Sequence, residues 1–312
     1  MAKTFLFPGQ GAQKIGMGAD FFRRFEFARK RFAQAGELLG RDLAALCFEG
    51  PQDQLTATQN TQPALFTVES IISDVLAEHG IAPAMTLGHS LGEYSALYAA
   101  GVFSFEDGFN LVSARGKLMA EAGKKAPGTM AAVVGLDRDK VAEVLRGVDG
   151  IVVPANENSP DQTVISGEIE AVKAAGEVLQ QAGAKRIIAL SVSGAFHSPL
   201  MQEAADEFSA VLAGVTFADA RCPVITNVTA DAQRDGEELR KLLVKQLTSP
   251  VRWVDSIRFV CSQEQGPCLE VGPGNVLRGL ARKIDRGMIV VSCESVDNVY
   301  SVIDSNKSQQ GE

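Results

Sequence analysis

The stretch Gly88-His89-Ser90-Leu91-Gly92 is the part of this sequence that indicates the fold most directly. It follows a short apolar run, residues 84–87, and precedes a helix-like run that ends at Gly101. Gly-x-Ser-x-Gly between a strand and a helix is the nucleophile elbow, a tight turn that lifts the serine hydroxyl above the edge of a sheet. A side chain at either glycine would crowd the strand or the helix as they fold back on each other. The stretch therefore predicts a strand–turn–helix unit that presents Ser90 as a nucleophile.

Helices and short apolar strands alternate on both sides of this unit. A buried strand over residues 4–7 is broken by Pro8-Gly9-Gln10-Gly11, and long helical patterns follow over 20–39, 62–79 and 104–121. The alternation predicts an α/β sheet. We expect it to resume late in the chain, with helices over 200–212, 237–247, 251–262 and 275–284 and strands over 268–271 and 288–291.

Residues 129–190 have an order of their own. Strand, helix, strand, strand, helix and strand follow one another, which is the ferredoxin-like pattern in about the length it needs. We therefore expect a small ferredoxin-like subdomain over residues 128–191, inserted into a large subdomain made of residues 1–127 and 192–304. The polar residues 305–312 are expected to form a flexible tail.

Composition excludes several classes of function. The 312 residues are 46% hydrophobic and 22% charged, as in ordinary soluble globular proteins. The net charge of −8 without a basic stripe argues against nucleic acid as a partner. Five scattered cysteines predict reduced thiols rather than disulfides or a zinc site. No apolar run approaches membrane-spanning length. We expect a soluble, cytoplasmic protein that binds no metal and no membrane.

A serine hydroxyl needs a base to take its proton, and the chain offers three histidines. His79 ends a helix just before a glycine, which favours a structural role, and His89 should leave the elbow in another direction than Ser90 and pack. His197 lies in a loop, residues 193–199, between the predicted small subdomain and the next helix. Because functional residues concentrate in such loops, His197 is the predicted base.

An oxyanion hole needs donors aimed at the developing charge. The amide of Leu91, directly after the nucleophile, is the usual first donor of an elbow. The loop Gly9-Gln10-Gly11-Ala12-Gln13, after the first strand, is the candidate for the second, and Gln10 is either that donor or a turn residue only. The glycines of this region fit neither the dinucleotide fingerprint nor the Walker A motif.

Further motifs extend the pattern over nearly the whole chain. In order, they are Phe7-Pro8-Gly9-Gln10-Gly11-Ala12-Gln13, Gln62-Pro63-Ala64, Gly88-His89-Ser90-Leu91-Gly92-Glu93-Tyr94, Arg115-Gly116, Asn158-Ser159-Pro160 with Gln162, Gly194-Ala195-Phe196-His197-Ser198 and Glu270-Val271-Gly272-Pro273-Gly274. Together they closely resemble the malonyl-CoA:acyl carrier protein transacylases, the stand-alone acyltransferases of fatty acid synthesis. The resemblance covers residues 3–291.

The resemblance implies roles for individual residues. Ser90 would be the acylated nucleophile and His197 its base, with Gln10 and the Leu91 amide forming the oxyanion hole. The backbone carbonyl of Gln246 would orient the histidine, so that the family works with a Ser–His dyad and no triad aspartate.

Two more positions would set specificity. From the residues alone, Arg115 is a helix residue whose charge would be solvated. The resemblance instead assigns it to the free carboxylate of the malonyl group, which a planar guanidinium can grip with two hydrogen bonds. Phe196, beside the base, resembles the bulky residue that disfavours α-branched acyl groups in malonyl-selective enzymes.

The resemblance also implies the fold and the partners. The fold would be α/β, an α/β-hydrolase-like large subdomain with an inserted ferredoxin-like small one. The substrates would be malonyl-CoA and acyl carrier protein, and we expect a monomer. No cofactor is expected, since the coenzyme A thioester is a substrate and phosphopantetheine belongs to the carrier. Acyl carrier proteins are acidic, so the cations Arg278, Arg282, Lys283 and Arg286 are either one docking face of a helix or merely a solvated face.

Three other functions use the same features. A serine esterase shares the elbow and would place an acid between the serine and the histidine, for which Asp107, Asp137 and Asp161 are available. The malonyl group could instead supply a polyketide pathway. A carrier-binding subunit without catalysis is the third, although every expected catalytic residue is present.

Overall fold

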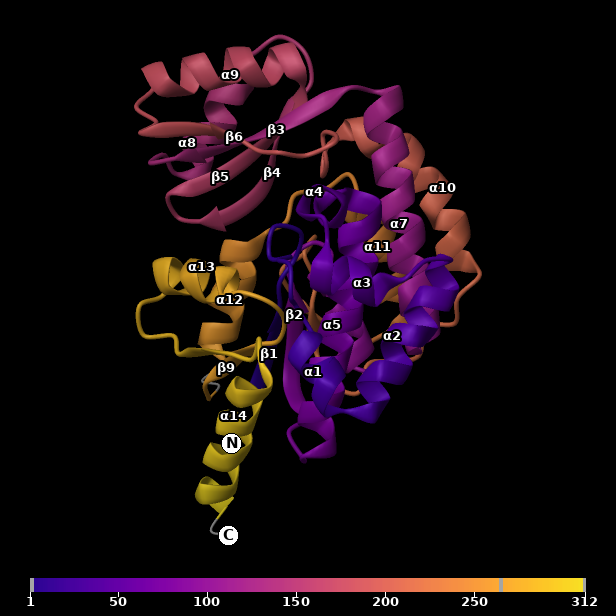
Figure 1. The fold of residues 1–312 in the computed structure, drawn as a ribbon. Coiled ribbons are helices and arrows are strands. Elements are labelled where there is room, and N and C mark those ends of the chain that lie inside the picture. The colour runs from indigo at the N-terminus through magenta and orange to yellow at the C-terminus, as the bar shows by residue number, and fades with distance from the viewer. Residues whose placement is uncertain (1–2, 264–265, 311–312) are drawn as a thin grey trace.

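The computed structural model describes residues 3–263 and 266–310, and it contains two β-sheets flanked by helices (Figure 1). The larger sheet has the strand order β10-β9-β1-β2-β7-β8. Its pairings are parallel from β10 to β7, and β7 pairs antiparallel with β8. The strands are β1 (Lys3–Phe7), β2 (Pro83–Gly88), β7 (Val224–Ile225), β8 (Ala232–Gln233), β9 (Cys268–Glu270) and β10 (Val290–Ser292).

Both faces of the larger sheet are covered, as a parallel sheet requires. Along β1 the side chains alternate: Phe5 and Phe7 join the main core on one face, and Leu6 joins a second core on the other. Helices α5 and α7 lie on the first face and α12 and α13 on the second (Figure 1). The helices of this part of the chain are α1 (Ala19–Arg24), α2 (Glu26–Leu39), α3 (Leu43–Glu49), α4 (Gln52–Thr56), α5 (Thr58–Glu78), α6 (Gly92–Ala99), α7 (Phe105–Lys125), α10 (Gln202–Ala213), α11 (Gly236–Gln246), α12 (Trp253–Ser262), α13 (Val276–Ile284) and α14 (Val296–Gln310), with a 3₁₀ turn at Pro199–Met201.

The smaller sheet is antiparallel, with the strand order β4-β5-β3-β6 and a core of its own beneath two helices. Its elements are β3 (Gly128–Val134), α8 (Arg138–Leu145), β4 (Val152–Ser159), β5 (Gln162–Glu168), α9 (Ile169–Gln181) and β6 (Arg186–Ala189). This is the predicted ferredoxin-like order, and the predicted fold class is confirmed. The division into subdomains at residues 128 and 191 remains a prediction.

The two sheets are joined by a short parallel contact. Val251, just before α12, donates its N–H to the carbonyl of Ala155 in β4 at 2.8 Å and accepts from the N–H of Glu157 at 2.9 Å. The helix predicted from Val251 therefore begins later, at Trp253, because the backbone of Val251 is engaged with β4.

Two predicted elements need correction. The helix predicted over 20–39 is interrupted at Phe25, which is extended so that its ring stacks on Phe21 at 6.2 Å. The expected flexible tail is wrong for residues 305–310, which belong to α14. That helix is held because Val299, Val302 and Ile303 are buried in the main core. Residues 311–312 lie outside the described residues. Among the helices described, none has the length and apolar character needed to cross a bilayer.

Candidate active site

The elbow lies at the carboxyl end of β2, the strand next to the centre of the larger sheet. Gly88 ends β2, Gly92 begins α6, and Ser90 between them has φ 52°, in the left-handed region. A Cβ on Gly88 would lie 1.9 Å from the carbonyl carbon of Gly92, and one on Gly92 would lie 2.0 Å from the carbonyl oxygen of Phe7. Both glycines are therefore required by close backbone approach, as the sequence predicts.

Ser90 and His197 meet although 107 residues separate them. The Oγ of Ser90 lies 2.8 Å from Nε2 of His197. Nδ1 of the same ring lies 2.8 Å from the carbonyl oxygen of Gln246 and 3.2 Å from that of Ser249. Because a carbonyl only accepts, Nδ1 must carry the proton, which leaves Nε2 as the acceptor for the serine proton. The structure thus brings together the serine, the histidine and the carbonyl that the sequence suggested.

His197 is held in its neutral, proton-accepting form. Burial first, and the nearby charge of Arg115 second, lower its pKa to about 3, against hydrogen bonds to the carbonyls of Gln246 and Ser249 that raise it. Its backbone is strained like that of the serine, with φ 57°. The ring is therefore a base rather than an acid before substrate arrives.

Arg115, on α7, points its guanidinium at the nucleophile. Nη2 donates to Ser90 Oγ at 3.0 Å and to Gln246 Oε1 at 2.9 Å, and Nη1 donates to Gln62 Oε1 at 2.9 Å. The side chain is 1% exposed, and within the described part of the chain no carboxylate forms a salt bridge with it. A buried cation normally has an anionic partner. The carboxyl group of Glu93 acts electrostatically on Arg115 and is linked to it through the side chain of Gln246.

The two expected oxyanion donors follow the carboxyl ends of the neighbouring strands β2 and β1. Leu91 follows Ser90 directly, and Gln10 lies in the loop after β1, whose last residue pairs with Gly88. Among the described residues, neither the N–H of Leu91 nor that of Gln10 donates to another group of the chain. The N–H of Ser90 is already used, because it donates to Asn227 Oδ1 at 2.7 Å. The arrangement leaves the Leu91 and Gln10 amides available for a ligand.

The other two histidines point elsewhere. His89 places Nε2 2.8 Å from Asn158 Oδ1 and packs its ring 5.4 Å from that of Trp253. His79 places Nδ1 2.8 Å from the carbonyl oxygen of Val75 at the end of α5. Both have the structural contacts that the sequence reasoning expected of them.

The remaining sequence candidates are placed as follows. Phe196 is 5% exposed and packs into the main core beside the base. The three possible triad acids serve turns and helix ends: Asp107 contacts Ser104, Asp137 caps α8 and Asp161 accepts from Ser159. In the part of the chain described, no carboxylate is hydrogen-bonded to His197. The arrangement is a dyad and not the triad of an esterase.

Two site residues escape the sequence reasoning. Asn227 follows β7 and bonds both to the Ser90 N–H and, through Nδ2, to the Gly88 carbonyl at 2.6 Å. Glu93, in the first turn of α6, is 1% exposed and accepts from Gln246. The apolar pair Val224-Ile225 is the local signal before Asn227, but two residues are too few to predict the strand β7.

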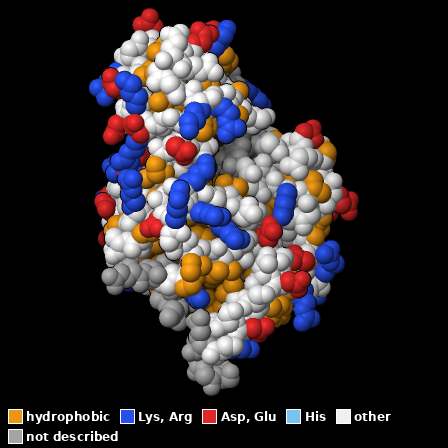
Figure 2. All heavy atoms as spheres, turned by 90° about the vertical axis from the view of Figure 1, so that its left-hand side faces the viewer, with side chains coloured by type: hydrophobic (Ala, Val, Ile, Leu, Met, Phe, Trp, Pro, Cys, Tyr) orange, Lys and Arg blue, Asp and Glu red, His pale blue; other side chains and the backbone are white. Residues whose placement is uncertain are grey.

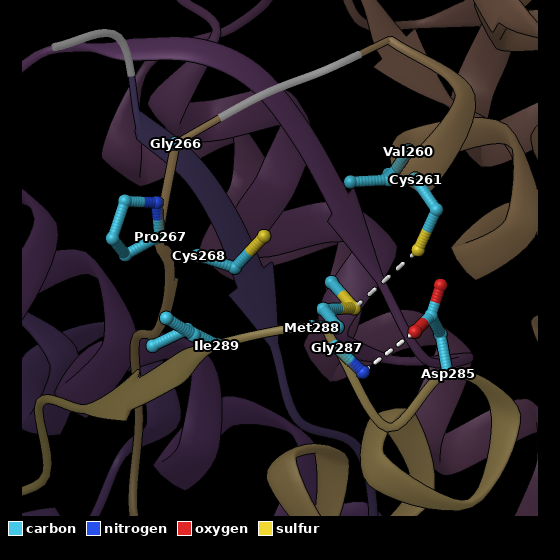
Figure 3. Close-up of a pocket in the computed structure, with 9 residues that line it drawn as sticks. All are labelled: Val260, Cys261, Gly266, Pro267, Cys268, Asp285, Gly287, Met288 and Ile289. Atoms are coloured by element: carbon cyan, nitrogen blue, oxygen red, sulfur yellow. Dashed lines mark hydrogen bonds between the residues drawn. The ribbon is translucent and has the colours of Figure 1, made fainter.

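A pocket elsewhere in the molecule has no part in this site. It lies at the amino end of β9, away from the carboxyl ends of the strands where the elbow lies, and has a volume of about 280 Å³. Figure 3 shows the residues that line it. Cys261 lies in it with its sulfur 4.0 Å from that of Met288. Burial raises the pKa of Cys268 to about 12 and that of Cys261 to about 11, so neither thiol is a nucleophile at neutral pH. Among the described residues, no cluster of His, Cys, Asp and Glu could hold a metal ion.

An elbow serine, a neutral histidine and two free amides define a serine enzyme that moves acyl groups. The family model described as the acyl transferase domain matches residues 4–294 of the chain. The malonyl CoA-acyl carrier protein transacylase of Bacillus subtilis (strain 168) is 41% identical over 309 residues, 98% of each chain. The enzyme of that name from Escherichia coli (strain K12) is 45% identical over 284 residues, 90% of this chain and 92% of the other.

Solved structures agree with these relatives. A malonyl-transacylase in complex with a type II polyketide acyl carrier protein has a TM-score of 0.94 and 41% identity, over 98% of this chain and 100% of the other. An acyl carrier protein S-malonyltransferase of Vibrio cholerae has a TM-score of 0.93 and 40% identity, over 97% and 100%. The chain belongs to the acyl transferase family, and it is an acyltransferase enzyme.

Proposed function

We propose that the chain transfers the malonyl group of malonyl-CoA to the phosphopantetheine thiol of acyl carrier protein, through a malonyl ester on Ser90. The observation that carries the proposal is the buried guanidinium of Arg115, which lies 3.0 Å from the nucleophile and forms no salt bridge with a carboxylate in the described structure. A malonyl thioester supplies the missing anion, since its free carboxylate lies two carbons from the carbonyl that Ser90 attacks. An acetyl thioester would leave the cation unpaired.

In the first half-reaction, Ser90 Oγ attacks the thioester carbonyl carbon while its proton passes to Nε2 of His197. The amides of Leu91 and Gln10 donate to the oxygen that becomes negative. The C–S bond then breaks, and the sulfur of coenzyme A takes the proton from Nε2 and leaves as the thiol. The product is malonyl-Ser90, with the neutral histidine restored.

The second half-reaction runs the same path in reverse. The carrier thiol gives its proton to Nε2, and its sulfur attacks the ester carbonyl carbon. The oxyanion collapses, and Ser90 Oγ leaves with the proton from the histidine. The Nδ1 hydrogen bonds to Gln246 and Ser249 keep the ring in one orientation through both steps. The chemistry needs no resident cofactor.

Specificity follows from the contacts around the acyl group. Arg115 would select malonyl over uncharged acyl groups because the guanidinium can form two hydrogen bonds to one carboxylate. Phe196, buried beside His197, would limit space at the carbon next to the carbonyl and so disfavour methylmalonyl groups.

The carrier would dock at a basic patch, which we define as Arg278, Arg282, Lys283 and Arg286. Figure 2 shows Lys and Arg side chains gathered across the middle of the face that carries α13. All four are exposed, and α13 starts at the carboxyl edge of β9, the edge on which the elbow lies. One detail of the predicted helix face is wrong, because α13 ends at Ile284 and Arg286 sits in the turn that follows.

The biological setting is fatty acid synthesis, in line with the names of the relatives at 41–45% identity over most of the chain. A carrier of a polyketide pathway is the second candidate acceptor, since one structural relative was solved with such a carrier. The five free cysteines support a cytoplasmic location, and we expect the enzyme to act as a monomer.

Intact-protein mass spectrometry after mixing with malonyl-CoA tests this function. We expect one malonyl adduct on the wild type, none on Ser90→Ala, and loss of the adduct when holo acyl carrier protein is added. Comparing a fatty acid carrier with a polyketide carrier as acceptor separates the two settings. Rapid release of malonate to water, without any acceptor, would instead show a hydrolase.

A further inference from the structure

Besides the groups that act on the substrate, two side chains hold the backbone of Ser90 by hydrogen bonds. Asn227 Oδ1 accepts from the Ser90 N–H at 2.7 Å, and Gln246 Nε2 donates to the Ser90 carbonyl at 3.0 Å. A third bond, from Asn227 Nδ2 to the carbonyl of Gly88, fixes the residue where the strand ends. Hydrogen bonds from side chains therefore hold the peptide group before Ser90 and the peptide group after it.

Both clamping residues bond to one carboxyl group. Gln246 Nε2 donates to Glu93 Oε2 at 2.5 Å, and the N–H of Asn227 donates to the same oxygen at 3.3 Å. The residues come from α11, from the loop after β7 and from α6, so that only the folded protein brings them together. We propose that Glu93 is a positioning residue for acyl transfer, which holds Asn227 and Gln246 so that they fix the nucleophile Ser90 and the base His197.

The strain at this site shows why such an anchor is needed. The non-glycine residues with positive φ in the described chain are Ser90 at 52°, His197 at 57° and Ala230 at 60°. Such a backbone conformation is strained, and it persists only where the surrounding structure holds it in place. Ala230 ends the loop that carries Asn227, and its N–H donates to Thr226 at 2.9 Å. The nucleophile, the base and the loop that supports the nucleophile thus all have strained backbone. Glu93 bonds to Asn227 in that loop and to Gln246, which bonds to Ser90 and His197.

Gln246 extends the effect of Glu93 to two further groups. Its backbone carbonyl accepts from Nδ1 of His197, and its Oε1 accepts from Nη2 of Arg115. A hydrogen bond from the Gln246 amide to a carboxylate is stronger than one to a neutral acceptor, so that Glu93 sets how firmly this side chain is held. Burial disfavours the charged form of Glu93 and raises its pKa to about 7, against the hydrogen bonds from Gln246 and Asn227 that lower it.

The inference rests on Ser90 being the nucleophile, but its test does not need malonyl transfer. Phenylmethylsulfonyl fluoride reacts with a serine that a histidine activates and has no carboxylate for Arg115. We would measure the rate of sulfonylation of Ser90 by mass spectrometry, together with kcat and KM for malonyl-CoA, in the wild type, Glu93→Gln and Glu93→Ala. The matched control is Glu69→Gln on α5, a fully buried carboxyl group that accepts from Ser95.

We expect Glu93→Ala to lower both the sulfonylation rate and kcat by about 100-fold, the effect of misplacing reacting groups by about 1 Å. Glu93→Gln should recover part of the loss, because its amide keeps one acceptor oxygen. Glu69→Gln should leave both rates within about twofold of the wild type, which corresponds to ~0.4 kcal/mol. The reason is that the hydrogen bond of Glu69 is to Ser95 and not to Ser90 or His197. Equal losses in the Glu69 and Glu93 variants, or wild-type sulfonylation in Glu93→Ala, would overturn the proposal.

Asn227→Ala keeps the test decisive should the Glu93 variants not fold. This side chain clamps Ser90 without contacting Arg115 among the described residues, so that sulfonylation and kcat should fall while KM for malonyl-CoA stays unchanged. A rise in KM with unchanged sulfonylation would contradict the positioning role. Failure of the wild type to form a malonyl adduct would refute the proposed function alone and leave the sulfonylation comparison intact.

Discussion

The guanidinium of Arg115 and the hydroxyl of Ser90 share a hydrogen bond of 3.0 Å, so that the group expected to bind the substrate's carboxylate is in contact with the nucleophile. A carboxylate that pairs with Arg115 therefore lies close enough to Ser90 for a short acyl chain to join the two. The same charge is among the causes that lower the pKa of His197. Recognition of the acyl group and readiness of the base are therefore linked through one side chain.

Arg115→Ala should lower kcat/KM for malonyl-CoA by about 100-fold or more, because two charge-assisted hydrogen bonds are lost. The same variant should accept acetyl-CoA better than the wild type does, since no buried cation is left unpaired. Arg115→Lys should not restore malonyl transfer, because an ammonium group cannot form the paired hydrogen bonds. Steady-state kinetics with both thioesters measure this, and unchanged malonyl kinetics in Arg115→Ala would refute the assignment.

Gly92→Ala should destabilise the protein by at least about 3 kcal/mol, because the new methyl group would overlap the Phe7 carbonyl oxygen at 2.0 Å. The acyl adduct should disappear with it. Gly279→Ala is the matched control, since a Cβ there meets nothing within 4 Å and lies inside α13. That control should gain about 1 kcal/mol from helix propensity. Denaturant unfolding measures both, and a Gly92→Ala protein of wild-type stability would contradict the close approach.

The pH dependence of kcat/KM should come from Glu93 and not from His197. The pKa of His197 is about 3, so that the free enzyme keeps its base neutral throughout the range from pH 8 to pH 5. The pKa of Glu93 is about 7, and protonation below that pH weakens its hold on Gln246. Wild-type kcat/KM should therefore fall severalfold as pH drops through this region. Glu93→Gln should give a low, flat profile, whereas a remaining limb near pH 6.5 would assign the titration to His197.

The double variant Arg282→Glu with Arg286→Glu should raise KM for acyl carrier protein by about tenfold at low salt and less at high salt, because exposed charges are screened. KM for malonyl-CoA should not change. Lys173→Glu with Lys307→Glu is the control, since both lysines are exposed on other helices, α9 and α14. An effect confined to coenzyme A substrates would mean that the basic patch serves another ligand.

Local patterns were sufficient for much of the fold. The elbow, the long helices and the order of the smaller sheet follow from hydrophobic periodicity, glycines and capping residues such as Ser104, which accepts from the N–H of Asp107. Strand β7 could not be recognised in this way, because two residues carry no periodicity and its place beside β2 depends on pairing with a distant strand. The C-terminal helix could not be predicted because its composition is mostly polar, although Val299, Val302 and Ile303 pack it against the main core.

The residues of the candidate site likewise fall into those that local sequence identifies and those that only the tertiary structure identifies. Ser90 and His197 are recognisable because their chemistry limits the choice to one serine turn and three histidines. The contacts of Asn227 and Glu93 cannot be recognised in this way. In the sequence, Asn227 resembles any polar loop residue and Glu93 resembles any acidic residue at the start of a helix. Their roles come from hydrogen bonds across 137 and 153 residues of chain. Such partners are set by tertiary packing.

These long separations also bear on when the enzyme becomes active as it is made. The hydrogen bond between Ser90 and His197 spans 107 residues, and those that hold it in place reach Gln246 in α11. Contacts between distant segments form late in folding, and a growing chain folds from its amino end. A nascent chain that stops before α11 contains Ser90 and His197 but lacks Gln246, which bonds to both of them. We therefore expect efficient acylation of Ser90 only after α11 has been synthesised and has packed against the elbow.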